Sequence, residues 1–385
     1  MPVSFVSLIV AVLSSVAASF TVSLSTRPNP SVILEPHTAQ IVADTLGFGD
    51  FEIIQFATVA SWSPESAMEL DNNGELVLAC RQGLTRDQLG ERGIEFAESQ
   101  IWLLTMLRVL DEEDGELRTA IPLLDTDETA ELRAETAAIA EEIAPQSAPG
   151  VEMLLNHLRA IGREGNAYSI LFSYVIDGLV WDRFEERGRI LVREITAERP
   201  FWSGEVWGVS PPRTDTASGT NSISDSGVAL KVNWSEPAIP LMGELMFDWG
   251  AQGAIVETLV AESRVVPNEV REKLARFDLV SEDGRLTIPV IDEQPGNILY
   301  EAATALADQI ADSALERLAP ANLVSRFGFR SHSQALVVAY HELMWDLMEQ
   351  WEASGLIQVP IALEGSAEAR PPDVAALVFA VREHE

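Results

Sequence analysis

The sequence has few of the residues on which metal and thiol chemistry depends. Its single cysteine, Cys80, excludes an internal disulfide and a site built from several thiolates. The five histidines are scattered, and none belongs to an HExxH zinc motif. A P-loop, a GxGxxG fingerprint and a GxSxG nucleophile elbow are also absent. We therefore predict no cofactor, no metal site and no catalytic residue, and we favour a non-catalytic protein over an enzyme.

Basic residues are scarce as well. Lys231 and Lys273 are the only lysines, and 26 Lys and Arg residues stand against 60 Asp and Glu residues, for a formal net charge of −34. Such a charge repels phosphate backbones and anionic membrane surfaces unless basic residues cluster locally. Nucleic acid is therefore a disfavoured partner, and a protein partner or self-association is expected.

The N-terminal stretch carries no charge. Residues 5–24 are long enough to cross a bilayer as a helix, and Val16-Ala17-Ala18 resembles a signal-peptidase site. No Lys or Arg precedes this stretch, and its serines and β-branched residues also suit a folded element. Two interpretations stay open: an export signal or membrane anchor, and part of a cytoplasmic fold, which is favoured.

The most informative feature of the 385 residues is a repeated phrase. In the first copy, Glu113-Asp114-Gly115-Glu116-Leu117 precedes Ile121-Pro122-Leu123-Leu124-Asp125. In the second, Glu282-Asp283-Gly284-Arg285-Leu286 precedes Ile288-Pro289-Val290-Ile291-Asp292. Each copy predicts an acidic turn followed by a short strand that contains proline.

The similarity continues beyond this phrase. A shift of 167 positions places Leu132 on Leu299 and Ile139 on Leu306, and each set lies on one apolar helical stripe. Further on, Leu179-Val180-Trp181-Asp182 recurs as Leu343-Met344-Trp345-Asp346. We interpret the two segments as modules of about 100 residues related by internal duplication.

The order of elements around each acidic turn resembles a winged helix-turn-helix. Thr85-Arg86-Asp87-Gln88 has the form of a capping box, which predicts a short helix to about Arg92, and a second helix follows over about 98–110. The acidic turn and the Ile-Pro strand come next. Residues 84–125 and 251–292 share this order, and the resemblance implies a mainly helical α+β fold.

The predicted division of the chain follows from the resemblance. It comprises an apolar N-terminal segment with a small unique region (1–83), winged-helix-like module A (84–191), a β-rich aromatic insertion (192–250), winged-helix-like module B (251–358) and C-terminal strands (359–385). Within the first region, the turn at Asp71-Asn72-Asn73-Gly74 predicts a strand over 75–80.

The insertion is the one stretch where small polar side chains gather beside aromatic ones. Alternating patterns predict strands over 201–208 and 228–234, joined by a polar loop that is either functional or an ordinary mobile hairpin. A small-molecule or peptide site in this region would be lined by Trp202, Trp207, Arg213, Asn221, Lys231 and Trp234. A small-molecule-binding protein or enzyme with its site here is one alternative function.

Many winged-helix proteins bind DNA through the second helix and the wing. The wing of module A would face phosphates with carboxylates, which argues against this use. Module B offers a small basic patch, made of Arg271, Lys273, Arg276 and Arg285. These cations either contact DNA or are solvated helix residues that pair with neighbouring acidic groups. A DNA-binding transcriptional regulator acting through module B is therefore a second alternative.

The function that we expect is a non-catalytic regulatory or scaffolding one, in which the duplicated modules make protein contacts. The recurring Asp182 and Asp346 either meet as a carboxylate pair or cap and pair with neighbouring helices. His341 lies beside Glu342 on the same helical pattern, as part of a carboxylate-rich face or as a satisfied core histidine.

Overall fold

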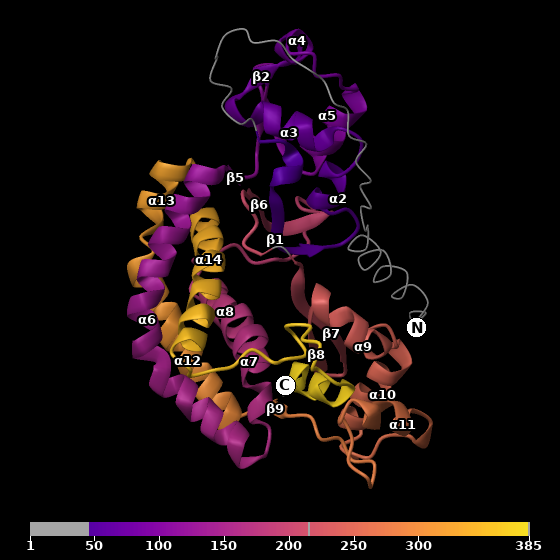
Figure 1. Ribbon diagram of the computed structural model, residues 1–385. Helices are drawn as coiled ribbons and strands as arrows, with labels where there is room; N and C mark the ends of the chain where they lie inside the picture. The colour runs from indigo at the N-terminus through magenta and orange to yellow at the C-terminus, as the bar shows by residue number, and fades with distance from the viewer. Residues whose placement is uncertain (1–45, 215, 384–385) are drawn as a thin grey trace, which may run out of the picture. The chain divides into compact units, whose positions relative to one another are not determined.

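The computed structural model describes residues 46–214 and 216–383, so the apolar stretch 5–24 lies outside the described residues. The structure is 53% helical and 17% strand, with three small sheets (Figure 1). The predicted mainly helical α+β class is therefore confirmed. The described residues form two compact units, which we call unit 1 (46–129 and 192–212) and unit 2 (130–191 and 213–383).

These units divide the chain differently from the predicted modules. The helices that follow residue 130 belong to unit 2, although module A was predicted to extend to 191. The first strand of the predicted insertion belongs to unit 1, because it pairs with a strand near the beginning of the described chain. Long-range strand pairing and helix packing thus determine the units, and neither depends on proximity in the sequence.

Unit 1 contains a sheet in the order β1-β6-β5. Strand β1 (Glu52–Val59) is antiparallel to β6 (Trp202–Val209), and β5 (Leu123–Leu124) is parallel to β6. The predicted strand over 201–208 is therefore present. A short 3-10 helix, η1 (Phe48–Asp50), precedes β1, and helix α2 (Pro64–Met68) follows it.

The rest of unit 1 covers the residues of the predicted helix-turn-helix and wing. In order they are α3 (Asn73–Ala79), η2 (Cys80–Gln82), β2 (Leu84–Thr85), α4 (Arg86–Glu91), α5 (Glu98–Met106), β3 (Leu110–Glu113) and β4 (Glu116–Thr119). The strands form a sheet in the order β2-β4-β3. The Thr85 side chain accepts a hydrogen bond from the Gln88 backbone, and the Gln88 side chain accepts one from the Thr85 backbone, so the capping box is present.

The predicted strand over 75–80 is wrong, because these residues belong to α3 and η2. The buried positions are Asn73, Gly74, Leu76, Val77 and Cys80. Their spacing of three and four residues is that of a helix face, and the turn signal at 71–74 had obscured it.

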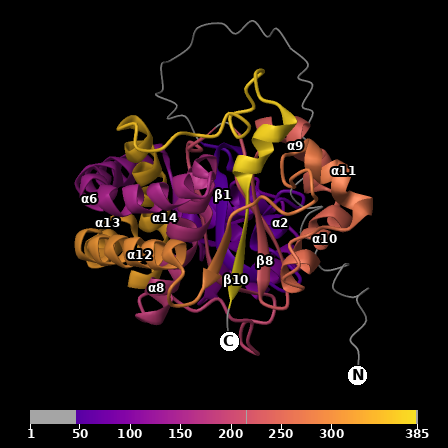
Figure 2. The same ribbon diagram turned by 90° about the horizontal axis from the view of Figure 1, so that it is seen from below.

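Unit 2 contains a four-stranded sheet in the order β7-β8-β10-β9. The strands are β7 (Ser218–Asp225), β8 (Val228–Ser235), β10 (Val378–Glu383) and β9 (Val290–Glu293). Val228, Leu230 and Val232 point to one face of β8 and belong to a hydrophobic core with α9 (Ile239–Met246) and α10 (Trp249–Val260). Helices flank both faces of this sheet (Figure 2).

The other small elements of unit 2 lie near this core. They are η5 (Glu236–Ala238), α11 (Asn268–Arg276) and η6 (Pro371–Leu377). Isolated bridges join Val265 to Arg285 and Val280 to Leu286. The predicted C-terminal strands reduce to one, β10, because the earlier apolar run, which contains Pro360, forms a turn.

The second helical layer of unit 2 consists of long helices. They are α6 (Thr126–Ala160, of which the first four residues belong to unit 1), η3 (Glu164–Asn166), α7 (Ala167–Ile170), the π-helix η4 (Leu171–Leu179), α8 (Val180–Glu186), α12 (Ile298–Arg317), α13 (Pro320–Phe327) and α14 (His332–Ala353). Figures 1 and 2 show α6, α12 and α14 side by side. Trp181 and Tyr340 meet edge to face with ring centroids 4.5 Å apart, and each also packs edge to face on Phe184.

The two copies of the repeated phrase have the same local geometry. After helices α5 and α11, Arg108 (φ 56°) and Asp278 (φ 54°) adopt the left-handed conformation. The next residues donate backbone hydrogen bonds back into the helix, Val109 to Leu104 at 2.8 Å and Leu279 to Leu274 at 3.1 Å. The acidic turns then close on glycines with φ of 82° and 79°, values that favour glycine over any other residue.

The Ile-Pro strands also pair in the same way. The Pro122 carbonyl accepts from the Gly208 backbone at 2.8 Å, and the Pro289 carbonyl accepts from the Ala380 backbone at 3.0 Å. In each case the strand after the proline is parallel to a later strand, β6 or β10. That later strand is in turn antiparallel to a strand that precedes the copy in the sequence, β1 or β8.

An ion cluster lies within the helical layer of unit 2. Arg213 contacts Glu342 at 3.0 Å and Glu349 at 3.0 Å and also pairs with Asp346, and Arg133 of α6 contacts Glu342 at 2.7 Å. Burial acts to raise the pKa of Glu342, but His341 and Arg133 outweigh it and hold the pKa at about 2. The Glu342 side chain is only 1% exposed, so its charge depends on these partners.

Glu342→Gln should destabilise unit 2 strongly, because it leaves the buried ends of two guanidinium groups without their shared carboxylate. We expect a loss of about 3 kcal/mol in the free energy of local opening of α14, measured by hydrogen exchange near neutral pH. Glu349→Gln is the matched control, because Glu349 also pairs with Arg213 but its side chain is 63% exposed. It should cost less than about 1 kcal/mol. Equal effects of the two substitutions would contradict the role of Glu342 as the shared buried partner of Arg133 and Arg213.

The low pKa of Glu342 predicts that the stability of α14 decreases in acid. The pKa of Glu342 is about 2 in the fold, below its ordinary value of about 4.3. The contribution of Glu342 to the free energy of local opening should therefore be complete above pH about 4.3 and should be lost as the pH falls toward 2. Hydrogen exchange of α14 over this range should show a smaller pH dependence in Glu342→Gln than in the unaltered protein.

Candidate protein-docking surface

Arg86 joins three elements of unit 1. It is the first residue of α4, directly after the Thr85 cap, and its guanidinium reaches both the beginning of α5 and strand β3. It contacts Glu98 at 2.9 Å and Glu112 at 2.7 Å, in both cases through two carboxylate oxygens. The hydrogen bond from Arg86 lowers the pKa of Glu112. Helices α4 and α5 and strand β3 are thus held together by one cation between two acids.

Trp102 lies on the same side of α5 as Glu98. The two residues are four positions apart and so are neighbours on one helix face, and the Trp102 side chain is 66% exposed. Ile101 and Leu104 point into the core of unit 1, which leaves Trp102 outside the buried stripe. A large aromatic side chain with this exposure has buried little of its apolar area within the fold.

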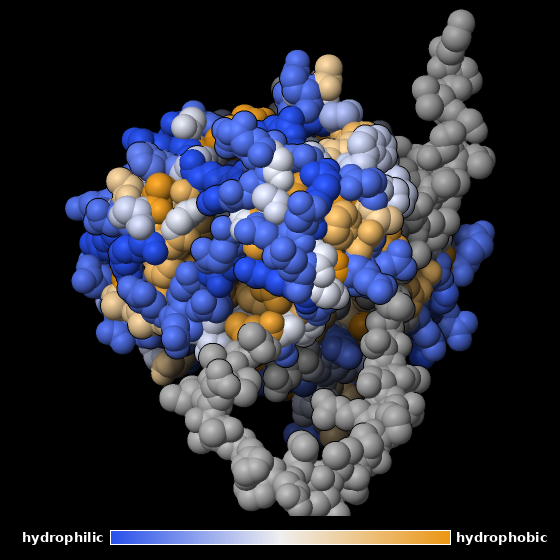
Figure 3. All heavy atoms as spheres, turned by 90° about the horizontal axis from the view of Figure 1, so that it is seen from above, coloured by the Kyte–Doolittle hydropathy of each residue, from blue (hydrophilic) through white to orange (hydrophobic). Residues whose placement is uncertain are grey.

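We call the surface formed by Glu98, Trp102 and Glu112 the Trp102 face. The wing beside it is exposed and acidic through Asp111, Glu113 and Asp114. On the face drawn in Figure 3, hydrophilic residues predominate and apolar patches lie between them. An exposed tryptophan one helical turn from a carboxylate is suited to a ligand that is both apolar and cationic.

The six residues predicted to line a ligand site fall in both units. Trp202 and Trp207 belong to unit 1, where Trp202 donates to the Leu107 carbonyl at 2.8 Å and Trp207 is fully buried. In unit 2, Trp234 donates to the Asn221 side chain at 3.2 Å, and Arg213 belongs to the buried ion cluster. Within either unit, these side chains are thus engaged in packing or in internal hydrogen bonds.

Lys231 has a distinct environment in unit 2. It lies on β8, on the opposite face from Leu230 and Val232. Burial lowers the pKa of Lys231, and the nearby carboxylates of Asp177 and Asp182 act in the opposite direction. The nearby carboxylates balance the charge of this half-buried lysine, so its position needs no ligand to explain it.

The four cations predicted as a basic patch are mostly paired within unit 2. Lys273 pairs with Asp248, Arg276 contacts Glu244 at 2.6 Å and Arg285 contacts Asp283 at 3.1 Å. The guanidinium of Arg271 covers the wing glycine, Gly284, where a Cβ atom would come within 2.4 Å of it. These contacts match the interpretation of solvated or structural helix cations better than that of a phosphate-binding surface.

The two recurring aspartates have different surroundings. Asp346 pairs with Arg213, and burial raises its pKa while Thr136 and Arg213 act against this rise. Asp182 is exposed on α8. His341 lies 3.7 Å from Glu342, as part of the ion cluster. In the part of the chain that the structure describes, no group of three or more His, Cys, Asp or Glu side chains is placed to hold a metal ion.

Sequence reasoning missed Trp102, although a signal was present. The helix predicted over 98–110 has an apolar stripe at Ile101 and Leu104, and a tryptophan directly after Ile101 falls outside that stripe. An aromatic residue outside the buried stripe of a helix is a candidate for an exposed contact residue.

Comparisons with known proteins give no relative from which a role could be transferred. No family model matches the chain, and no curated protein and no solved structure matches it either. Among the helices of residues 46–383, leaving out residue 215, none is long and apolar enough to cross a membrane.

Arg86→Gln should loosen unit 1 locally, because it separates α4, the beginning of α5 and β3. We expect the protection of α4 and α5 amides against hydrogen exchange to fall by about 0.5–1 kcal/mol, and by less at high salt. Arg118→Gln is the matched control, because Arg118 pairs with Glu116 on its own strand and not with Glu98 or Glu112. The part of the effect due to Glu112, whose pKa is lowered, should be present above pH about 4.3 and should fade as the pH drops below it. Equal loss of protection in both variants would refute the role given to Arg86.

Proposed function

We propose that this protein is a non-catalytic regulatory or scaffolding protein with two winged-helix-like modules, related by internal duplication, that mediate protein contacts. In this proposal the first module binds a basic partner protein through the Trp102 face. The observation that carries the proposal is the 66% exposure of Trp102 beside acidic residues on the second helix of the helix-turn-helix.

The order and pairing of elements in unit 1 support the winged-helix-like description. A helix, a short strand, two helices and two strands joined by a tight turn follow one another, and the first strand pairs with the last. Duplication is supported by the recurrence of the left-handed residue, the wing glycine and the parallel Ile-Pro strand in the second copy. Two unrelated segments would not be expected to share these three features in the same order.

A protein partner fits the charges of the first module better than DNA does. The surfaces that would face phosphates in a DNA complex carry Glu98, Glu112, Glu113 and Asp114. Each close approach of a carboxylate to a phosphate costs free energy, and the net charge of −34 adds long-range repulsion. The same charges attract a basic surface and increase its rate of association.

The chemistry of the Trp102 face specifies the partner more closely. An indole ring offers a flat apolar surface and attracts a cation above its plane, most effectively an arginine guanidinium. Glu98 and Glu112 supply carboxylates at the edge of that surface, where a second cation can pair. We therefore propose a partner segment in which arginine or lysine lies next to an apolar or aromatic side chain.

Selection from a random peptide display library against the full chain tests this proposal. Selected peptides should be enriched in basic residues next to apolar ones, and Trp102→Ala should weaken their binding by about 2 kcal/mol, as for a hot-spot tryptophan. Trp249→Ala is the matched control, because Trp249 is also an exposed tryptophan but lies in unit 2. It should leave the affinity unchanged.

Two results would contradict the proposal. One is that selected peptides bind the Trp102→Ala variant as tightly as the unaltered chain. The other is tight, steeply salt-dependent binding of random duplex DNA that is abolished by charge reversal of Arg271 and Lys273, which would favour DNA recognition by the second module.

A further inference from the structure

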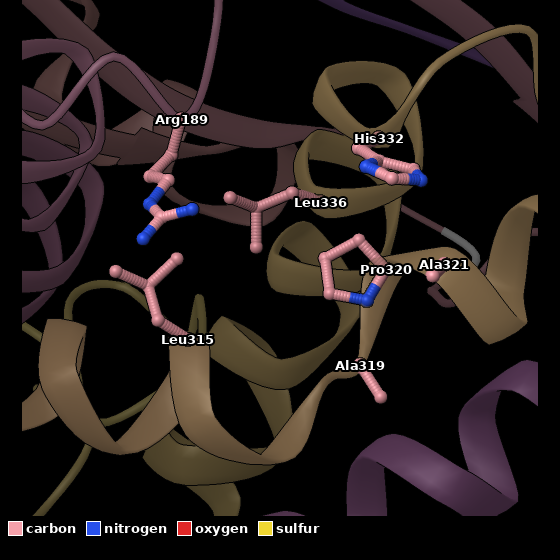
Figure 4. A pocket seen from close by; sticks show the side chains of 7 residues that line it. All are labelled: Arg189, Leu315, Ala319, Pro320, Ala321, His332 and Leu336. Atoms are coloured by element: carbon pink, nitrogen blue, oxygen red, sulfur yellow. The ribbon is translucent and has the colours of Figure 1, made fainter.

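Unit 2 contains a hollow of about 250 Å³ at the turn between α12 and α13. Leu315 of α12, the turn residues Ala319 to Ala321 and Leu336 of α14 form its walls. Arg189, which follows α8, and His332, the first residue of α14, complete the lining. In the close view, Arg189 and His332 lie on opposite sides of Leu336 (Figure 4).

The backbone at this turn is unusual. Ala319 adopts the left-handed conformation with φ of 40°, which is costly for a residue with a Cβ atom. The conformation lets the chain reverse between the end of α12 and Pro320 at the beginning of α13. Residues held in such conformations are enriched at ligand sites, where the surrounding fold maintains them.

The two basic side chains at the hollow differ from most others in this acidic protein. In the described part of the chain, neither the Arg189 guanidinium nor the His332 ring makes a hydrogen bond or ion pair. By contrast, Arg187, only two residues before Arg189, contacts Asp312 at 2.6 Å. His332 also lies in the first turn of a 22-residue helix, whose N-terminal end favours an anion.

Apolar side chains lie between Arg189 and His332. Leu336 is buried and Leu315 and Pro320 are half-buried, so they form an apolar floor, and the exposed residues Arg189 and His332 give the hollow its polar edges. A cavity of about 150 Å³ accommodates benzene, whereas drug-sized ligands occupy about 300 Å³ or more. A volume of about 250 Å³ therefore suits a single ring or a short chain that carries one small polar group.

We infer that this hollow binds a small organic carboxylate, with its apolar body against Leu315, Pro320 and Leu336 and its carboxylate on the Arg189 guanidinium. An arginine fork matches the two oxygens of a carboxylate. This binding site lies outside the winged-helix-like surfaces, and the inference is independent of the proposed protein contacts.

Isothermal titration calorimetry of the full chain with phenylacetate tests the inference. Phenylacetamide serves as the uncharged probe of the same shape. We expect phenylacetate to bind with a Kd of about 1 mM or below and phenylacetamide to bind at least about tenfold more weakly. Arg189→Gln should weaken phenylacetate binding by at least about tenfold, with Arg285→Gln as the control that removes the same charge from an exposed site in unit 2.

A second variant tests the position of the apolar body. Ala321→Phe adds volume to the wall from an exposed position and removes no core side chain, so it should block phenylacetate while the fold is retained. Its circular dichroism spectrum and melting temperature should match those of the unaltered chain. Equal binding of phenylacetate and phenylacetamide would overturn the inference, as would undetectable phenylacetate binding or unchanged affinity in both Arg189→Gln and Ala321→Phe.

Discussion

The helical layer of unit 2 depends on the neutralisation of a carboxylate that is almost completely buried. Glu342 has no access to water, so its charge requires cations within the fold, and two arginines from distant parts of the chain supply them. Arg133 comes from α6, and Arg213 is the first residue of unit 2 after the chain returns from β6. The buried Glu342 carboxylate therefore connects α6, α14 and the segment that enters unit 2. If any one of these elements shifted, the carboxylate would lose a cationic partner while it stayed buried in a low-dielectric interior.

The acidic residues of the Trp102 face have a different environment from Glu342. There the carboxylates stay in water, and Arg86 links only two of them, so the surface keeps its negative charge while its backbone is held in place. Exposed pairs contribute little to stability, because solvent screens them. In the proposed function their effect is on recognition, since carboxylates close to an exposed indole ring disfavour anionic partners and attract cationic ones. Buried acids thus shape the fold of unit 2, and exposed acids shape the surface of unit 1.

Local signals in the sequence predicted the fold better than long-range ones. The capping box at Thr85, the strands β6 and β8 and the two glycine turns were predicted because each depends on a few neighbouring residues. Helix α3 was missed where a turn signal competed with a short helical stripe. The Arg213 cluster and the hollow at Arg189 could not be predicted, because their members come from segments separated by more than a hundred residues. The Trp102 face could be predicted in part, since the helical pattern marks Trp102 as exposed but does not reveal that Glu112 of another element lies on the same surface.

Comparison of the two copies indicates how the proposed duplication has been used. When the helices are aligned on Leu104 and Leu274, which accept equivalent backbone hydrogen bonds, Trp102 corresponds to Glu272. The second copy therefore has no aromatic residue at this position, and its helix cations pair with nearby acids. Its wing glycine is covered by Arg271, whereas the equivalent Gly115 has no atom near its Cβ position. One copy thus has an open wing and an exposed anchor, and the other has a closed, internally paired surface. Such divergence is expected when one module keeps a binding surface and its relative serves mainly to complete the fold.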